Sequence, residues 1–280
     1  MQTRDIILTG LPRSGTTLTV KLLNQVQNVV GLHEPMSFTD VAGPENKSAG
    51  LDYVTGFFER ERREILASGT ACTHHINGMV PDNHMSKQYG GNGLRQANIS
   101  RERIKIDKKL TDDFYLVIKH PAAFTALLEV LLPYYSCYAI IRNPLAVLAS
   151  WNSVNLPVQD GRAYVAEKFD QALSHALREG KGRMERQLHL LAWWFNKYLT
   201  LLPRERIIKY ENIVASGGKT LSVIVADAED LDEKLESKNM NELYDQGHMK
   251  YLVKQLMEQD GPYWKFYSKE ETLQLVNDWS

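Results

Sequence analysis

The sequence reads IILTGLPRSGTT over residues 6–17, where an apolar run opens into a loop bounded by glycines. Gly10 and Gly15 stand five residues apart, and hydroxyl residues close the loop, as in the phosphate-binding pattern G-x-x-x-x-G-K-S/T. Thr16 takes the place of the usual lysine, and the cation of the loop is Arg13 instead. A protein that binds ATP with Mg²⁺ rarely lacks that lysine, so the loop favours a different phosphorylated ligand.

The residue types of this stretch predict a strand, a loop and a helix in that order. Apolar residues 6–8 suit a buried parallel strand, and the glycines let backbone N–H groups approach an anion. From Thr17 onward, leucines and valines recur at helical spacing. The first amides of that helix and its dipole would then face the phosphate. An ordinary strand–turn–helix is the alternative.

Composition narrows the class of protein. A chain of 280 residues with 43% hydrophobic residues can bury one substantial core, and a net charge of −1 argues against a nucleic-acid partner. Cys72 and Cys137 are too few for a disulfide framework and fit a reducing compartment. The sequence shows no leader-like start and no apolar stretch near about 18 residues. We therefore expect a cytoplasmic protein without a membrane span.

Three further apolar runs are each followed by helix-like sequence. We expect strands at residues 114–118, 138–141 and 206–210, and helices at 122–132, 145–154, 184–202 and 218–226. Strands that alternate with helices predict an α/β fold, a P-loop-type parallel sheet flanked by helices. Ligands of such sheets bind at the carboxyl ends of the strands. The charged residues expected to converge there are Arg13, Lys119, His120 and Arg142.

Arg142 begins a segment that carries a family resemblance. Arg142-Asn143-Pro144 ends an apolar run, and Ser150 follows the arginine by eight residues. This spacing resembles the 3′-phosphate-binding segment of the sulfotransferases that use 3′-phosphoadenosine 5′-phosphosulfate (PAPS). Residues 12–17 resemble that family's 5′-phosphosulfate loop, in the arginine form of the tyrosylprotein and many bacterial members. Cytosolic small-molecule members carry lysine at the position of Arg13.

Weaker similarities extend the resemblance toward the C-terminus. Tyr210-Glu211 resembles the family's Tyr-Glu pair, whose tyrosine lies near the adenosine, and residues 261–265 loosely resemble a segment that closes over the donor. PAPS carries phosphate groups on both sides of its ribose, so a metal-free pocket needs two cationic clamps, and arginine suits phosphate oxygens. The resemblance implies donor contacts from Arg13, Ser14, Gly15, Thr16, Thr17, Arg142, Ser150 and Tyr210.

An acceptor hydroxyl also needs a general base. Glu34, 21 residues after Arg13, resembles the catalytic glutamate of the tyrosylprotein sulfotransferases. His120 resembles the histidine of the cytosolic Lys-Thr-His motif without the threonine, and Lys119 matches a lysine that could brace the sulfate. We favour Glu34 as the base, with His120 next and His33 after it. Each could instead be structural, as a turn cap, a strand-end cation or a packed histidine.

A zinc site is a weaker possibility. Cys72, His74 and His75 lie together with His84 nearby, but no paired ligand spacing completes a site. We therefore expect no metal. A loop that lines an acceptor pocket is the alternative interpretation of this cluster.

These observations predict one sulfotransferase domain over residues 1–280 that moves a sulfuryl group from PAPS to a hydroxyl or amine and releases adenosine 3′,5′-bisphosphate. We interpret residues of about 36–110 as helices and loops, inserted between core strands, that form the acceptor wall. The sequence does not choose among small-molecule, glycan and peptide acceptors. The alternatives are a P-loop small-molecule or nucleotide kinase, which would need a carboxylate after a strand to hold Mg²⁺, and a non-catalytic nucleotide-binding module.

Overall fold

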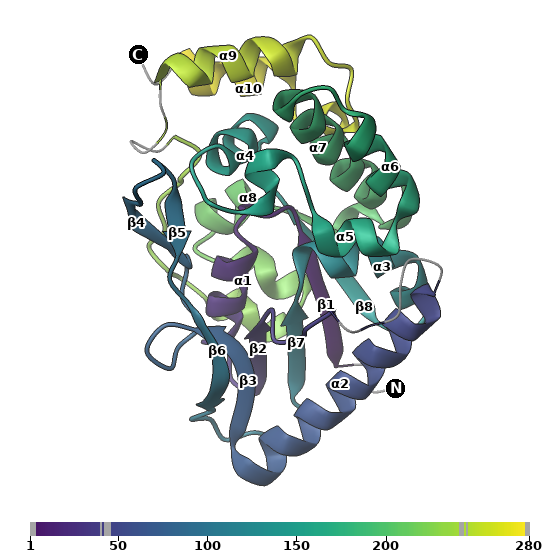
Figure 1. Ribbon diagram of the computed structural model, residues 1–280. Coiled ribbons are helices and arrows are strands. Elements are labelled where there is room, and N and C mark those ends of the chain that lie inside the picture. The colour runs from purple at the N-terminus through teal and green to yellow at the C-terminus, as the bar shows by residue number, and fades with distance from the viewer. Residues whose placement is uncertain (1–3, 40, 42–45, 241–243, 245, 278–280) are drawn as a thin grey trace.

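The centre of the molecule is a five-stranded parallel sheet with helices on both faces (Figure 1). The computed structural model describes residues 4–39, 41, 46–240, 244 and 246–277. The strand order is β2-β7-β1-β8-β9. The strands are β1 (Asp5–Gly10), β2 (Val29–His33), β7 (Tyr115–Lys119), β8 (Ser136–Ile141) and β9 (Ile207–Lys209). This arrangement confirms the expected α/β fold.

Ten α-helices are found in the described part of the chain. They are α1 (Thr16–Leu23), α2 (Lys47–Ser68), α3 (Pro121–Leu131), α4 (Pro144–Trp151), α5 (Tyr164–Phe169), α6 (Gln171–Glu179), α7 (Arg183–Leu201), α8 (Tyr210–Ala215), α9 (Gln246–Met257) and α10 (Lys269–Asn277). Short 3₁₀ turns are η1 (Pro157–Asp160), η2 (Arg204–Arg206), η3 (Lys219–Val223), η4 (Ala226–Asp230) and η5 (Pro262–Lys265). Within the residues that the structure describes, the helices are too short or too polar to form a transmembrane segment.

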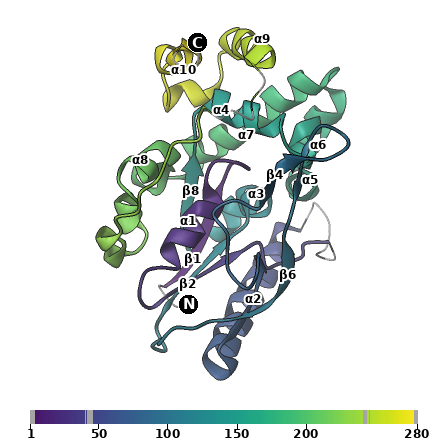
Figure 2. The same ribbon diagram turned by 90° about the vertical axis from the view of Figure 1, so that its left-hand side faces the viewer.

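The sheet is buried on both faces because successive side chains of a strand point to opposite sides. On β1, Ile6 and Leu8 belong to one apolar cluster, with Val20 of α1, while Ile7 belongs to the other, with Leu127 of α3. All five side chains are at most 2% exposed. Figure 2 shows α1 and α8 on one side of the sheet and α2 and α3 on the other. The unbroken apolar runs of the sequence follow from this two-sided burial.

Most of the predicted core elements are confirmed within a few residues. β7, β8 and β9 occupy the three expected strand positions, and α3, α4 and α7 the expected helical ones. The strand β2 was not predicted, although residues 29–32 form a short apolar run. The predicted helix at 218–226 is wrong: the helix after β9 starts at Tyr210, and Gly217 and Gly218, both at positive φ, end it before η3.

The segment between β2 and β7 contains more strand than the sequence indicated. After the long helix α2 come β3 (Thr70–His75), β4 (Met85–Tyr89), β5 (Arg95–Ala97) and β6 (Ser100–Lys105). β3 pairs with β6 and β4 with β5, both antiparallel. The interpretation of this segment as helices and loops is therefore wrong in part. Its strands are short and mostly polar, so their apolar alternation is weak, and cross-strand pairing forms them instead.

Candidate functional site

The five strands of the sheet bring the predicted residues to one edge. The carboxyl ends of parallel strands share an edge, where ligands of such sheets bind. The residues at or just after those ends are Gly10, Glu34, Lys119, Arg142 and Tyr210. Segments separated by up to two hundred residues in the chain therefore meet around the loop that follows β1.

The loop after β1 is shaped to hold an anion. Gly10 and Gly15 have φ of 150° and 93°, and a Cβ on Gly15 would lie 2.6 Å from the ring of Tyr210. The hydroxyl of Ser14 donates to the carbonyl of Ile140 (2.8 Å), which fastens the loop to β8. Among the described residues, no backbone oxygen accepts from the N–H groups of Gly15, Thr16 and Thr17. These N–H groups lie at the N-terminus of α1, where the helix dipole favours a bound anion.

Arg13 and Arg142 lie on either side of this loop. Arg13 Nε donates to Ser150 Oγ (3.2 Å) and its NH1 to Asn83 Oδ1 (3.0 Å). Arg142 NH1 donates to the carbonyl of Arg13 (3.0 Å), and its Nε to Asn239 Oδ1 (2.7 Å). The Arg142 guanidinium carbon also lies 4.7 Å from the centre of the Tyr210 ring. The structure thus brings together Arg13, Ser150, Arg142 and Tyr210, four of the residues for which the sequence resemblance implied donor contacts.

A third guanidinium, which the sequence did not indicate, lies next to these two. Arg95 of β5 is 3% exposed, and its NH2 donates to Ser153 Oγ (2.7 Å), one turn beyond Ser150. Burial, and then the neighbouring charges of Arg95 and Arg142, lower the pKa of Arg13 to about 10. No carboxylate among the described residues pairs with Arg13, Arg95 or Arg142. Within the described residues, the site therefore concentrates positive charge without a carboxylate to balance it.

Glu211 stabilises the rim of this site. Its Oε1 accepts from the backbone N–H of Asn143 (2.9 Å) and from Asn239 Nδ2 (2.8 Å), and its Oε2 accepts from the hydroxyl of Tyr267 (2.9 Å). The Tyr210 hydroxyl accepts from the backbone N–H of Lys238 (3.0 Å), the residue directly before Asn239. The Tyr-Glu pair thus connects β8, α8 and the C-terminal segment, which fixes the position of Arg142.

Glu34 and Lys119 form a close ion pair beside the glycine loop. Lys119 Nζ lies 2.5 Å from Glu34 Oε1, and Lys119 is 2% exposed while the Glu34 side chain is 33% exposed. Burial opposes ionisation of the carboxyl, but the charge of Lys119 holds the pKa of Glu34 well below its usual value. Glu34 has a φ of 45°, an uncommon backbone conformation for a glutamate. The arrangement presents an ionised carboxylate to solvent from a fixed position.

His120 is packed into the protein on the other side of Lys119. Its Nε2 accepts from the backbone N–H of Met36 (3.0 Å), and its ring packs against Phe38 and Phe124. Burial lowers the pKa of His120 to about 3. The imidazole is therefore neutral, and its accepting nitrogen is already occupied by backbone.

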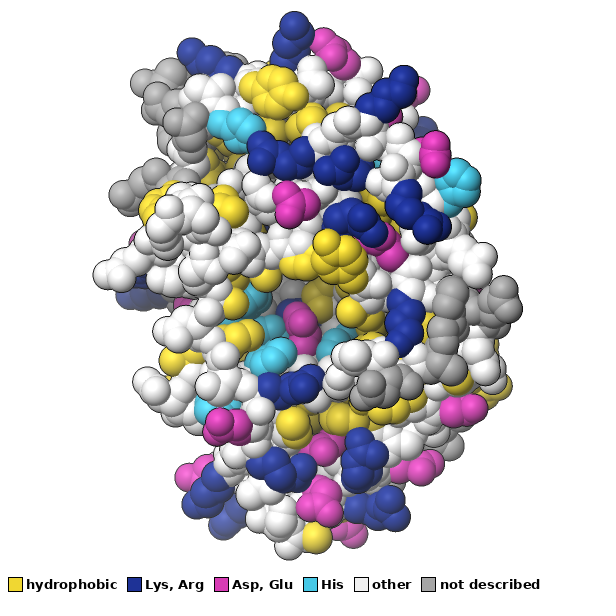
Figure 3. Space-filling view, viewed as in Figure 1, with side chains coloured by type: hydrophobic (Ala, Val, Ile, Leu, Met, Phe, Trp, Pro, Cys, Tyr) yellow, Lys and Arg dark blue, Asp and Glu magenta, His cyan; other side chains and the backbone are white. Residues whose placement is uncertain are grey.

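Three further histidines gather near Glu34. His33 Nε2 lies 3.5 Å from Glu34 Oε1, and the His33 ring centre lies 5.5 Å from that of His74 and 5.1 Å from that of His84. Figure 3 shows a hollow near the centre of this face, where histidine side chains surround an acidic one. Cys72 is directed elsewhere, with its sulfur near the carbonyl of Pro35. The Cys72–His84 cluster of the sequence is therefore only partly assembled.

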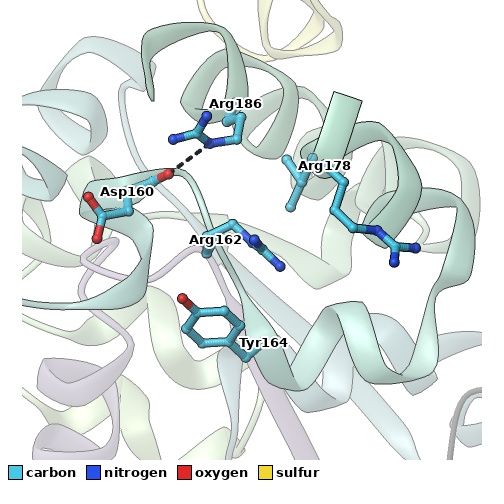
Figure 4. Close-up of a pocket in the computed structure, with 6 residues that line it drawn as sticks. Asp160, Arg162, Tyr164, Arg178 and Arg186 are labelled. Atoms are coloured by element: carbon cyan, nitrogen blue, oxygen red, sulfur yellow. Dashed lines mark hydrogen bonds between the residues drawn. The ribbon is translucent and has the colours of Figure 1, made fainter. Parts of the chain in front are cut away.

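A second hollow of about 390 Å³ lies away from this edge, between η1 and helices α5–α7. Figure 4 shows Arg162, Arg178 and Arg186 around it. Arg186 Nε donates to the carbonyl of Asp160 (3.0 Å), and Arg162 forms an ion pair with Glu167. Glu167 already balances the charge of Arg162, whereas the described partners of Arg13, Arg95 and Arg142 are neutral oxygens, so this hollow has less capacity for an added anion than the site at the strand ends.

Comparison with known proteins gives little further information. No family model and no curated protein matches the chain. Among solved structures, the chain is similar to the sulfotransferase STF1 from Mycobacterium tuberculosis, with 13% identity and a TM-score of 0.37. That match covers 92% of this chain and 78% of the mycobacterial one.

Proposed function

We propose that the protein is a sulfotransferase that moves a sulfuryl group from PAPS to a hydroxyl or amine of an acceptor. The observation that carries this proposal is a set of three arginines, Arg13, Arg95 and Arg142, that lie beside a glycine loop and have no carboxylate partner in the described part of the chain. A donor with separate phosphate groups on two sides of a ribose supplies the missing counter-charge. In this proposal residues 1–280 act as one P-loop-type domain.

The donor would lie across the carboxyl edge of the sheet. Its 5′-phosphosulfate would bind to the free N–H groups of Gly15, Thr16 and Thr17 and to Arg13, which would exchange its contact with Asn83 for phosphate oxygen. Its 3′-phosphate would bind to Arg142 and Ser150. The product that remains would be adenosine 3′,5′-bisphosphate.

Glu34 and Lys119 would carry out the transfer step. Glu34 takes the proton of the acceptor hydroxyl while the acceptor oxygen bonds to sulfur. The bond from sulfur to the bridging oxygen breaks, and its electron pair stays on the phosphate, where Arg13 offsets the charge. Loss of one such preorganised donor typically costs about 2.7–4 kcal/mol of barrier. Lys119 would move from Glu34 to the sulfuryl oxygens, which removes a cation from the carboxylate and makes it a stronger base.

Glu34 fits the role of base better than His120. The Nε2 of His120 already accepts from the Met36 N–H, and that side chain is 6% exposed. The Glu34 side chain is 33% exposed, so an acceptor can reach it. We propose that the segment of about 36–110, which supplies His74 and His84, forms the acceptor wall.

Thermal denaturation with added nucleotides tests this function. We expect adenosine 3′,5′-bisphosphate to stabilise the wild type without Mg²⁺ and Mg²⁺-ATP to have little effect. Arg142→Ala should weaken bisphosphate binding by at least about tenfold, because it removes charge-assisted hydrogen bonds. Arg178→Ala, in the second hollow, is the matched control and should respond like the wild type. A larger stabilisation by Mg²⁺-ATP would contradict the proposal and favour a kinase.

A further inference from the structure

We propose that His33, Glu34 and His74 bind a divalent transition-metal ion of the zinc class, and that the bound ion blocks the acceptor side of the site. Metal binding itself is independent of the proposed sulfuryl transfer, whereas the inhibitory effect rests on it. The reaction proposed above uses no metal, so the ion would act as an inhibitor of that reaction.

The positions of the ligand atoms carry this proposal. One imidazole nitrogen of His33, one of His74 and a carboxylate oxygen of Glu34 all lie within 4.8 Å of one another. Imidazole nitrogen and carboxylate oxygen are ordinary ligands of Zn²⁺ and Co²⁺. Small side-chain rotations are enough to bring three atoms from this spacing onto one ion.

Unpartnered nitrogen atoms in the same cluster support it independently. His33 is 1% exposed, and its Nδ1 has no hydrogen-bond partner in the described chain. The Nδ1 atoms of His74 and His84 are also buried and without a partner there. Buried polar atoms are almost always hydrogen-bonded, so several unpartnered nitrogen atoms in one cluster indicate that a ligand binds there. The ring of His84 packs 5.1 Å from that of His33, beside the three ligand residues.

The backbone holds the two histidine-bearing strands in a fixed relation. The N–H of His33 on β2 donates to Thr73 Oγ1 on β3 (2.8 Å), and Thr73 is fully buried next to His74. A ligand set held by strands is more precise than one on loops. The site is therefore partly assembled before an ion arrives.

Lys119 sets the affinity of this site. Its ammonium lies 2.5 Å from the Glu34 oxygen, so an ion must displace it or use the other oxygen of the carboxylate. A nearby positive charge also repels a divalent cation. Loss of the Lys119 charge should therefore tighten metal binding. An ion on Glu34 occupies the lone pairs that would take the acceptor proton, while the arginines that would hold the donor stay free.

Titration of the metal-free protein with Co²⁺, followed by its visible ligand-field bands, tests the site directly. We expect saturation at one ion per chain and displacement by Zn²⁺. His74→Ala and His74→Gln should each weaken binding by at least about tenfold, the effect seen even when outer-shell partners of a metal site are lost. Lys119→Met should bind more tightly, and His189→Ala, at an exposed position on α7, should match the wild type.

Binding that is unsaturable, or that is equal in the wild type and a folded His74 variant, would overturn the metal site. Melting curves establish that the variants are folded. Stabilisation by adenosine 3′,5′-bisphosphate should persist with Zn²⁺ present, because that ligand would contact the arginines. Sulfuryl transfer that continues unchanged on the Zn²⁺-loaded protein would overturn the inhibitory role. Failure of the proposed function shows separately, as absence of bisphosphate binding in metal-free buffer.

Discussion

Glu34 is the residue on which turnover should depend most. Glu34→Gln keeps the shape of the side chain but removes its ability to take a proton, so we expect transfer to fall by about 10²–10⁴-fold. Affinity for adenosine 3′,5′-bisphosphate should stay within about twofold, since a general base contributes to the chemical step and not to donor binding. Transfer of ³⁵S from labelled PAPS to metabolites of a cell extract measures the first quantity, and calorimetry the second. Unchanged transfer would exclude Glu34 as the base.

Arg95 should contribute to nucleotide affinity although no sequence pattern marks it. Its guanidinium is buried against Ser153 and adds to the charge around Arg13. Arg95→Met should weaken the binding of adenosine 3′,5′-bisphosphate by several-fold or more, because a buried charge acts in a medium of low dielectric constant. Fluorescence or calorimetric titration measures the change, with Arg178→Met as control. Equal affinities in the two variants would show that Arg95 is purely structural.

At the scale of elements, the turn from β1 into α1 depends on glycine. Gly15 has a φ of 93°, and a Cβ there would lie 2.6 Å from the Tyr210 ring. Gly15→Ala should therefore lower the free energy of unfolding by more than about 1 kcal/mol and weaken nucleotide binding. Gly56→Ala is the matched control: Gly56 lies inside α2 with no atom near its added Cβ, so it should stabilise by about 0.5–1 kcal/mol. Urea denaturation measures the free energy of unfolding of both variants. Equal changes in the two would contradict the interpretation that the loop requires glycine at position 15.

The carboxylate of Glu129 joins three helices at the surface. It accepts from Lys47 of α2 (2.7 Å) and Lys197 of α7 (2.9 Å). These hydrogen bonds lower the pKa of Glu129 below the ordinary value of 4.5. The stabilisation is thus present above pH 4.5 and is lost as the pH falls through the lower, folded-state pKa. When the pH is lowered from neutral, the melting temperature of Glu129→Gln should fall less than that of the wild type. Plots of melting temperature against pH that are parallel for the two proteins would contradict this prediction.

At the scale of the whole molecule, local patterns in the sequence predicted the core elements. They did not predict the contacts between residues that are far apart in the chain. The strand–loop–helix of residues 6–23 is encoded in adjacent residues, and so is the helix start at residues 142–150, where Asn143 caps α4. Arg95 meets Ser153 across 58 residues of chain, and His33 meets His74 only because β2 and β3 pack together. Neither contact has a local signal. The same holds for Asn239, which a loop far along the chain brings to Arg142.

The most direct test is a crystal structure with adenosine 3′,5′-bisphosphate, grown in the presence of a chelator. We predict that the 5′-phosphate binds to the N–H groups of Gly15 to Thr17 and to Arg13, and that the 3′-phosphate binds to Arg142 and Ser150. We also expect no divalent ion between the two phosphates. A bisphosphate bound in the arginine hollow between α5 and α7, or one that touches neither Arg13 nor Arg142, would contradict this prediction.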